Sequence, residues 1–191
     1  MMIPIIDSGH GFDTMGKRSK GFYYPNGKVE LKENCVNEAV ANKLSALFDW
    51  NNREAHFISK EWYDISLDER CNRERKIARQ IRNKGDESYF LSIHADAFHV
   101  KNGAKGGRFF YKSEGGKRLA YHFTEYLRNN GYELSLREPA KANFKVLRDT
   151  SSPAILFEMG FMTTRSDLDF LKKDSFRNKT AKLLYEASIL L

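Results

Sequence analysis

Two histidines in this chain follow predicted strands, and two glutamates could complete a catalytic metal site with them. His10 follows the apolar run 2–6, and His94 follows the apolar run 89–93. Both runs are short and rich in β-branched or aromatic residues, which predicts buried strands. The carboxyl ends of strands in an open α/β sheet form the edge where ligands bind. Two imidazoles at that edge, joined by a carboxylate, predict a zinc site that leaves one coordination position to water.

Two acids are candidates to complete this site. Glu33 opens a predicted helix, where the helix dipole favours a carboxylate, although an ordinary first-turn acid needs no ligand. Glu38 on the same helix is a rival, but it lies off the apolar stripe, so we prefer Glu33. Glu158 ends the apolar run 154–157. Glutamate is almost never fully buried unless it is paired or bound to a metal, so Glu158 is a candidate for a working site.

The elements that must position these residues alternate between strands and helices. This alternation predicts an α/β fold with three layers, α/β/α, around a central mixed, mostly parallel sheet of about six strands. The length suits a single catalytic domain over residues 1–191. Besides the two strands before the histidines, we expect strands at 56–59, 108–111, 145–147 and 154–158, and helices at 33–48, 67–83, 117–130, shortly after 165 and at 175–190.

Composition narrows the class of protein further. Hydrophobic residues make up 41% of the chain and charged residues 30%, and no stretch is long and apolar enough to predict a membrane span. The first residues lack the pattern of a secretory signal, which predicts a protein held in the cytoplasm until release or a mature or truncated secreted enzyme. Cys35 and Cys71 are expected to be buried free thiols. The formal charge of +7 predicts attraction to polyanions.

Five segments contain the candidate residues or lie between them. They read IIDSGHG at 5–11, LKENCVN at 31–37, SLDER at 66–70, SIHADA at 92–97 and VLR followed by PAILFEMGF between 146 and 161. Together they resemble a known family, the zinc-dependent N-acetylmuramoyl-L-alanine amidases, and they cover nearly the whole chain in the family's order. The opening segment is similar to the family's first histidine motif, and the later ones to its glutamate helix, its SLxxR segment, its second histidine motif and its closing segment.

The resemblance implies a role for each candidate. His10, Glu33 and His94 would bind one Zn²⁺, and Glu158 would be the catalytic glutamate. The implied reaction is hydrolysis of the amide that joins N-acetylmuramic acid to L-alanine of the peptidoglycan stem peptide. Zinc would lower the pKa of its bound water and polarise the carbonyl, while Glu158 would transfer the proton.

Further residues are tied to the substrate or depart from the family's pattern. Arg148 is a candidate for binding a stem-peptide carboxylate, although it could equally be a surface arginine. Asp96 is a second candidate for substrate contact, and stands where the family pattern has Asn. Ser8 stands in place of Pro, and Phe12 in place of a glycine, which could narrow the mouth of the site.

The expected partner is peptidoglycan, and the net charge is expected to attract anionic wall polymers as well. The chain is expected to be a monomer that binds no nucleic acid. A phage lysin, a sporulation enzyme or an autolysin would each fit. Two alternatives stay open at this point. One is a zinc peptidase that cuts the stem peptide, and the other is a non-enzymatic domain that binds polyanions through its basic residues.

Overall fold

A computed structural model of the protein describes residues 2–191 and contains one six-stranded sheet in the order β2-β1-β3-β6-β4-β5. All neighbouring strands are parallel except β4 and β6, which are antiparallel. The sheet is therefore mixed and mostly parallel, as predicted. Its strands are β1 (Ile3–Ser8), β2 (His56–Phe57), β3 (Ser88–Asp96), β4 (Arg108–Tyr111), β5 (Ala140–Lys141) and β6 (Ala154–Phe161).

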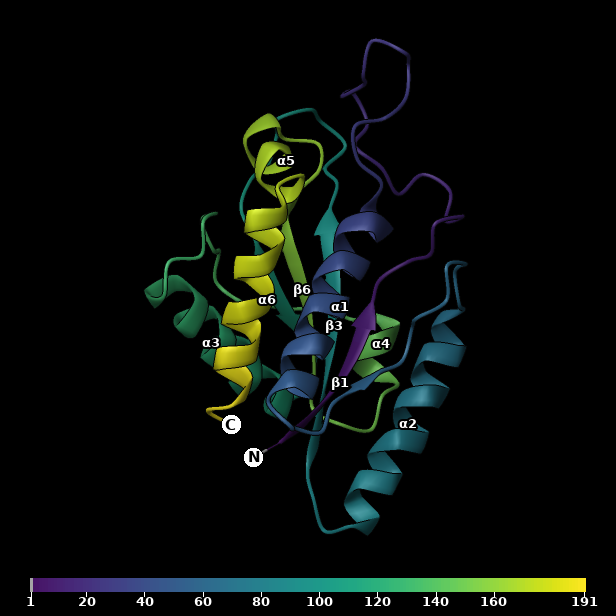
Figure 1. The fold of residues 1–191 in the computed structure, drawn as a ribbon, viewed down its shortest axis with the longest axis vertical. Helices are drawn as coiled ribbons and strands as arrows, with labels where there is room; N and C mark the ends of the chain where they lie inside the picture. The colour runs from purple at the N-terminus through teal and green to yellow at the C-terminus, as the bar shows by residue number, and fades with distance from the viewer. Residues whose placement is uncertain (1) are drawn as a thin grey trace.

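Helices cover both faces of the sheet and complete the three layers (Figure 1). Two separate hydrophobic cores mark the two sides, because buried residues of α1, α3, α5 and α6 belong to one cluster and those of α2 and α4 to the other. The helices are α1 (Glu33–Trp50), α2 (Leu67–Asn83), α3 (Glu114–Asn129), α4 (Lys145–Arg148), α5 (Arg165–Leu171) and α6 (Asp174–Ser188). Each of them, within residues 2–191, is too short or too polar to cross a lipid bilayer.

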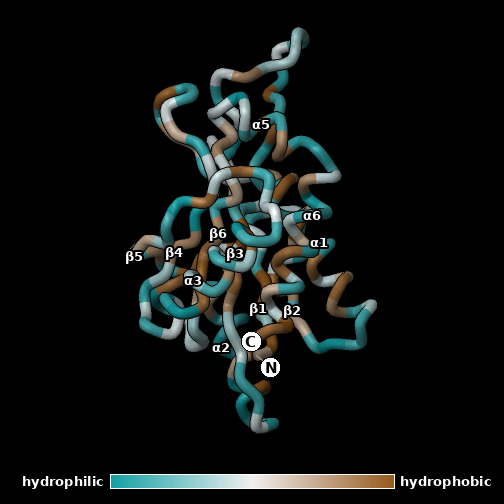
Figure 2. Tube along the Cα trace, turned by 90° about the vertical axis from the view of Figure 1, so that its left-hand side faces the viewer, coloured by the Kyte–Doolittle hydropathy of each residue, from teal (hydrophilic) through white to brown (hydrophobic). Residues whose placement is uncertain are grey.

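The central strands are apolar on both faces because both faces are covered. Ile6 and Leu91 pack in the core under α1, while Ile5 and Phe90 pack in the core under α2, and all four are fully buried. A parallel strand buried on two sides reads as a continuous apolar run, which is why these strands could be predicted. The hydrophobic residues accordingly follow β1, β3 and β6 through the interior (Figure 2).

Several predicted elements differ from the observed ones. The predicted strand at 145–147 is wrong, since these residues form α4. Strand β5 was not predicted, and β3 and β6 run three residues beyond the predicted ends, so His94 and Glu158 lie inside strands. The prediction that both cysteines are buried is wrong for Cys35, which is exposed, while Cys71 is buried.

A long segment, residues 9–32, lies beyond the carboxyl ends of the central strands and leads into α1 (Figure 1). Glu30 links this segment to the region of α5 by two ion pairs. Its Oε1 lies 2.7 Å from Nη2 of Arg165, and its Oε2 lies 2.6 Å from Nζ of Lys172. The hydrogen bonds from these two cations lower the pKa of Glu30 to about 2. At the end of the segment, the amide of Glu33 donates to the carbonyl of Lys17 at 3.0 Å, which fixes the first residue of α1.

Candidate metal centre

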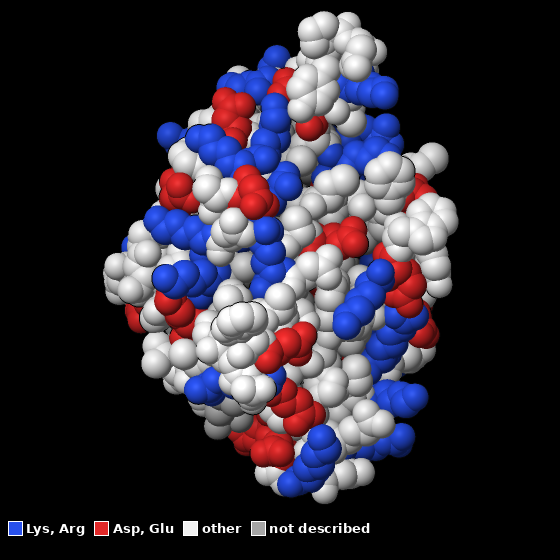
Figure 3. All heavy atoms as spheres, in the orientation of Figure 1, with Lys and Arg blue, Asp and Glu red and all other residues white. Residues whose placement is uncertain are grey.

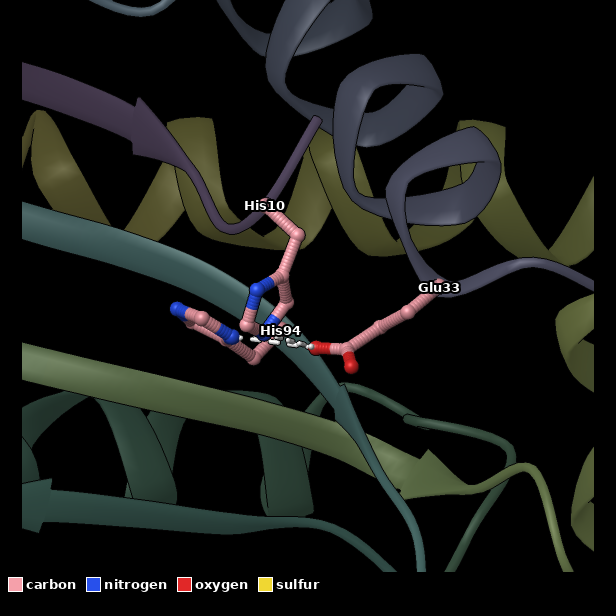
Figure 4. Close-up of side chains that lie close together, drawn as sticks. All are labelled: His10, Glu33 and His94. Carbon is pink, nitrogen blue, oxygen red and sulfur yellow. Dashed lines mark hydrogen bonds and ion pairs between the residues drawn. The ribbon is translucent and has the colours of Figure 1, made fainter. Parts of the chain in front are cut away.

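Three of the predicted site residues meet beyond the carboxyl ends of β1 and β3. His10 follows β1, Glu33 begins α1 and His94 lies near the end of β3. One ligand atom from each lies within 4.8 Å of the others. The Oε1 atom of Glu33 is 3.4 Å from Nε2 of His10 and 3.0 Å from Nδ1 of His94. Both imidazoles thus approach one carboxylate oxygen (Figure 4).

The glycines beside His10 create the room for this convergence. A Cβ atom on Gly9 would lie 2.0 Å from Cε1 of His94, so any side chain there would overlap the imidazole. A Cβ atom on Gly11 would lie 2.1 Å from the backbone nitrogen of Asp64. His10 itself has a φ of 65°, a left-handed conformation that is uncommon for residues other than glycine and that often marks functional sites.

Glu33 is held in place from several sides. Its side chain is 4% exposed, and its Oε1 accepts hydrogen bonds from Nδ2 of Asn37, at 3.3 Å, and from the amide of Ala95, at 3.4 Å. Asn37 also donates to the carbonyl of Gly9 at 2.9 Å, which joins α1 to the segment that carries His10. Burial alone would raise the pKa of Glu33, but the hydrogen bonds with the two histidines outweigh it, so this pKa lies well below its usual value.

A buried chain of polar groups orients His94. Its Nε2 atom lies 3.1 Å from Oγ of Ser92, which donates to Oδ2 of Asp7 at 2.6 Å. Arg70 pairs with the other oxygen of Asp7 and donates to the carbonyl of Ser8 at 2.6 Å. Because Nε2 is engaged in this chain, Nδ1 is the nitrogen that faces Glu33. Such outer contacts are what fix the ring orientation of a metal-binding histidine.

These outer residues were not singled out from the sequence. Asp7 follows an apolar run in the sequence, as Glu158 does. The position of an acid at the end of a predicted buried strand could therefore have identified Asp7 as a site residue. Arg70 lies in the segment that is similar to the family's SLxxR segment, but the sequence alone did not predict a role for it. Ser92 gave no signal, because a serine inside a buried strand is common.

Glu158 lies next to the three converging residues. Its Cα is the register partner of the Cα of His94 across β6 and β3. It lines the same cavity as His10, Glu33 and His94, which has a volume of about 570 Å³. Its Oε2 atom is buried without a hydrogen-bond partner. Burial is the main reason that the pKa of Glu158 is raised to about 8.

The two candidate substrate contacts have different surroundings. Asp96 lines the cavity, its Oδ1 accepts from the amide of Ala97 at 2.8 Å, and burial raises its pKa. Arg148 ends α4, does not line the cavity and pairs with the carboxylate of Asp149 at 2.8 and 3.1 Å. Glu38, the rival acid on α1, does not line the cavity either.

The donor set fits a catalytic zinc ion. Two imidazole nitrogens and one carboxylate oxygen are the protein ligands of one of the common catalytic zinc sites, in which water takes the fourth position. The buried contacts of Glu33 and His94 supply the outer support that such a site needs. The cavity leaves space for a substrate beside the ligand atoms.

Comparisons with known proteins agree with this geometry. A family model described as N-acetylmuramoyl-L-alanine amidase matches residues 5–189. The endolysin of Bacillus phage SPP1 is 26% identical over 184 residues, which are 93% of this chain and 61% of the endolysin. The amidase CwlM of Bacillus licheniformis is 28% identical over 183 residues, which are 93% of this chain and 63% of CwlM.

The likeness extends to solved structures. The N-acetylmuramoyl-L-alanine amidase AmiC2 of Nostoc punctiforme has a TM-score of 0.80 at 25% identity, covering 99% of this chain and 96% of its own. The catalytic domain of CwlV from Bacillus (Paenibacillus) polymyxa has a TM-score of 0.79 at 23% identity, covering 100% of this chain and 97% of its own. The chain spans less than two thirds of the length of the curated relatives named above.

Proposed function

Because this chain belongs to the N-acetylmuramoyl-L-alanine amidase family, we propose that it hydrolyses the amide between N-acetylmuramic acid and L-alanine in peptidoglycan. The observation that carries the proposal is the convergence of His10, Glu33 and His94, within 4.8 Å, beside the half-buried Glu158 in one cavity. This arrangement provides a metal site and a separate carboxyl group for proton transfer, which are the two requirements of metal-assisted amide hydrolysis.

We assign one Zn²⁺ per chain to Nε2 of His10, Oε1 of Glu33 and Nδ1 of His94. When bound, zinc supplies a water of lowered pKa and a positive charge that polarises the scissile carbonyl. Glu33 brings a negative charge to the ligand set, and its hydrogen bonds with His10 and His94 outweigh the effect of burial on its pKa and keep it ionised. Ser92 and Asp7 hold the ring of His94 with Nδ1 toward the ligand set.

Glu158 is the proposed proton carrier. The attacking water adds to the carbonyl carbon and gives a proton to Oε2 of Glu158, the buried oxygen without a partner. The same proton then passes to the nitrogen of L-alanine as the C–N bond breaks, which yields a lactyl carboxylic acid and a free amine. Burial places the pKa of Glu158 at about 8, close enough to neutrality for the group to accept and return a proton.

Asp96 remains a proposed substrate contact because it lines the cavity next to this group. Arg148 remains a prediction with weaker support, since Asp149 already occupies its guanidinium. The proposed substrate places the enzyme at the cell wall, and residues 5–189, which match the family model, are proposed as its catalytic unit.

The reaction is tested by digesting purified peptidoglycan and analysing the products by mass spectrometry. We expect intact glycan strands and stem peptides that carry a new free amine on L-alanine. Fragments cut within the stem peptide, with the muramoyl-L-alanine amide intact, would instead identify a peptidase.

The role of Glu158 is tested by the Glu158→Gln variant. We expect zinc content equal to that of the parent protein and a loss of turnover of about 10²- to 10⁴-fold, the usual contribution of general acid–base catalysis. Metal content is measured by atomic emission and turnover by release of the alanine amine. Full turnover in this variant would remove Glu158 from the mechanism.

The ligand assignment is tested by His94→Ala. We expect this variant to lose its zinc, while His99→Ala, which alters an exposed loop histidine, should keep one equivalent per chain. Retention of one equivalent in His94→Ala would contradict the assignment.

A further inference from the structure

Two arginines lie on segments that pair next to the strand that carries Glu158, on the side of β4. Arg108 begins β4, and its Cα is the register partner of the Cα of Glu158 on β6. Arg137 follows Leu136, which forms a parallel bridge with Gly107. The amide of Arg137 donates to the carbonyl of Gly107 at 2.9 Å. Backbone pairing therefore places the two arginines on neighbouring segments, directly beyond the strand that carries Glu158.

Each guanidinium group lies near an aromatic ring. Cζ of Arg108 is 5.9 Å from the ring centroid of Phe110, which packs edge-to-face on Phe144 at 5.4 Å, and Phe144 lines the cavity. Cζ of Arg137 is 4.9 Å from the ring centroid of Phe161. The rings limit the positions that these long side chains can take.

Neither arginine has a carboxylate in direct contact with its guanidinium group among the described residues. Within residues 2–191, no ion pair or side-chain hydrogen bond is made by Arg108 or Arg137, and the Nε atom of each is buried without a partner. The buried Arg70, by contrast, has two carboxylate partners. Burial and the nearby charge of Arg108 lower the pKa of Arg137, against the smaller opposing effects of Asp96, Asp167 and Glu158. Two neighbouring cations with unsatisfied donors are a costly arrangement that a bound anion would relieve.

The chemistry at Glu158 indicates which part of a substrate would bring that anion. In the proposed function, on which this inference rests, Glu158 gives a proton to the nitrogen of L-alanine. The peptide half of the substrate must then extend from the Glu158 side of the cavity, where β4 lies. Stem peptides carry carboxylates, and the planar fork of arginine matches a carboxylate through two parallel hydrogen bonds.

We propose that Arg108 and Arg137 together bind a carboxylate of the stem peptide and thereby select acidic over amidated substrates. Asp149 pairs with the guanidinium group of Arg148, whereas no carboxylate pairs with those of Arg108 and Arg137 among the described residues. They act on the peptide half and leave the metal site unchanged.

The test compares two small substrates, N-acetylmuramoyl-L-alanyl-D-glutamic acid and its α-carboxamide. For the parent protein we expect kcat/KM to be roughly 10- to 100-fold higher for the acid, the usual effect of a charge-assisted hydrogen bond. Arg137→Gln and Arg108→Gln should each lower kcat/KM for the acid and leave that for the amide nearly unchanged. Arg137→Lys should recover part of the preference, because it keeps the charge and loses the fork.

Arg118→Gln is the matched control, since Arg118 is an exposed arginine that lines a different cavity with Ser88 and Pro153. It should leave the acid-to-amide ratio unchanged. Circular dichroism and thermal melting identify any variant that fails to fold, and in that case Arg137→Lys and Arg108→Lys carry the comparison. A parent protein that cleaves acid and amide equally well, or an Arg108→Gln, Arg137→Gln double variant that keeps the preference, would overturn the inference.

A binding measurement separates this inference from the proposed function. Calorimetry on the Glu158→Gln variant measures the affinity for the same acid and amide without turnover. We expect tighter binding of the acid, abolished by adding Arg137→Gln. Equal affinities would overturn the inference even if hydrolysis is observed. A parent protein that binds the acid preferentially but cleaves neither compound would contradict the proposed function alone.

Discussion

At the scale of single residues, the site depends on which nitrogen of His94 faces the ligand set. Ser92 engages Nε2, Asp7 engages Ser92, and Arg70 engages Asp7. This order leaves Nδ1 for a metal. Outer contacts of this kind commonly change metal affinity by 10- to 100-fold when they are removed.

Ser92→Ala removes this contact without breaking the ion pair between Asp7 and Arg70. We expect the zinc affinity to fall by about 10- to 100-fold because the ring of His94 loses its fixed orientation. Competition with a chromophoric chelator measures the affinity. Ser113→Ala, which removes the N-cap of α3, is the control and should change stability but not zinc affinity. An unchanged affinity in Ser92→Ala would show that the hydroxyl does not position the ring.

The sequence allowed the inner residues of the site to be predicted more readily than the outer ones. His10, Glu33 and His94 are brought together as predicted, although their role as zinc ligands stays a prediction. Arg108 and Arg137 were not identified as a pair, because their proximity comes from β-pairing between distant segments. Local patterns in a sequence do not contain such pairing.

At the scale of elements, α1 matters because its first residue is a candidate ligand. Its N-cap residue, Lys32, makes no side-chain capping bond. The start of the helix is instead fixed by the contact between Glu33 and Lys17 and by the ion pairs that Glu30 forms with Arg165 and Lys172.

Glu30→Gln tests this attachment through pH. The folded-state pKa of Glu30, about 2, lies below its ordinary value of 4.5. Its stabilising contribution is therefore complete above about pH 4.5 and is lost as the pH falls toward 2. We expect the parent protein to be more stable than Glu30→Gln at neutral pH, with the difference shrinking below pH 4.5. Urea unfolding at several pH values measures it, and the exposed Glu125→Gln serves as the control. A difference that does not vary with pH would exclude this ion-pair contribution.

Helices and strands were predicted correctly where the apolar pattern was long, and they were missed or misassigned where it was short. The long patterns of α1 and α2 gave their starts correctly. The residues 145–147 were wrongly predicted as a strand because a short apolar run fits a buried helix turn equally well. Cys35 was wrongly predicted to be buried, since it lies in the first turn of α1 and is exposed.

At the scale of the whole molecule, the excess of positive charge is spread over a wide surface. Lysine and arginine side chains gather over α5 and α6 on the left of this face and along α2 on the right, with acidic residues between them (Figure 3). The formal net charge is +7. A distributed charge of this kind attracts anionic polymers over long range without selecting among them.

Raising the salt concentration tests this attraction. Screening shortens the range of the field from about 30 Å at 0.01 M ionic strength to about 3 Å at 1 M. We expect retention on purified cell walls to fall steeply over this range, as measured by sedimentation. Walls stripped of anionic polymers should bind weakly at every concentration. Binding that does not depend on salt would contradict an electrostatic contribution.

The three proposed ligands come from different elements, and this affects the thermal stability of the protein. They come from a segment after the first strand, from the start of a helix and from a central strand, so an ion held among them links three elements that are distant in the sequence. Loading with zinc should therefore raise the melting temperature, and a strong chelator should lower it, by mass action on the folded state. The ion proposed for the reaction would then also stabilise the folded structure around the site.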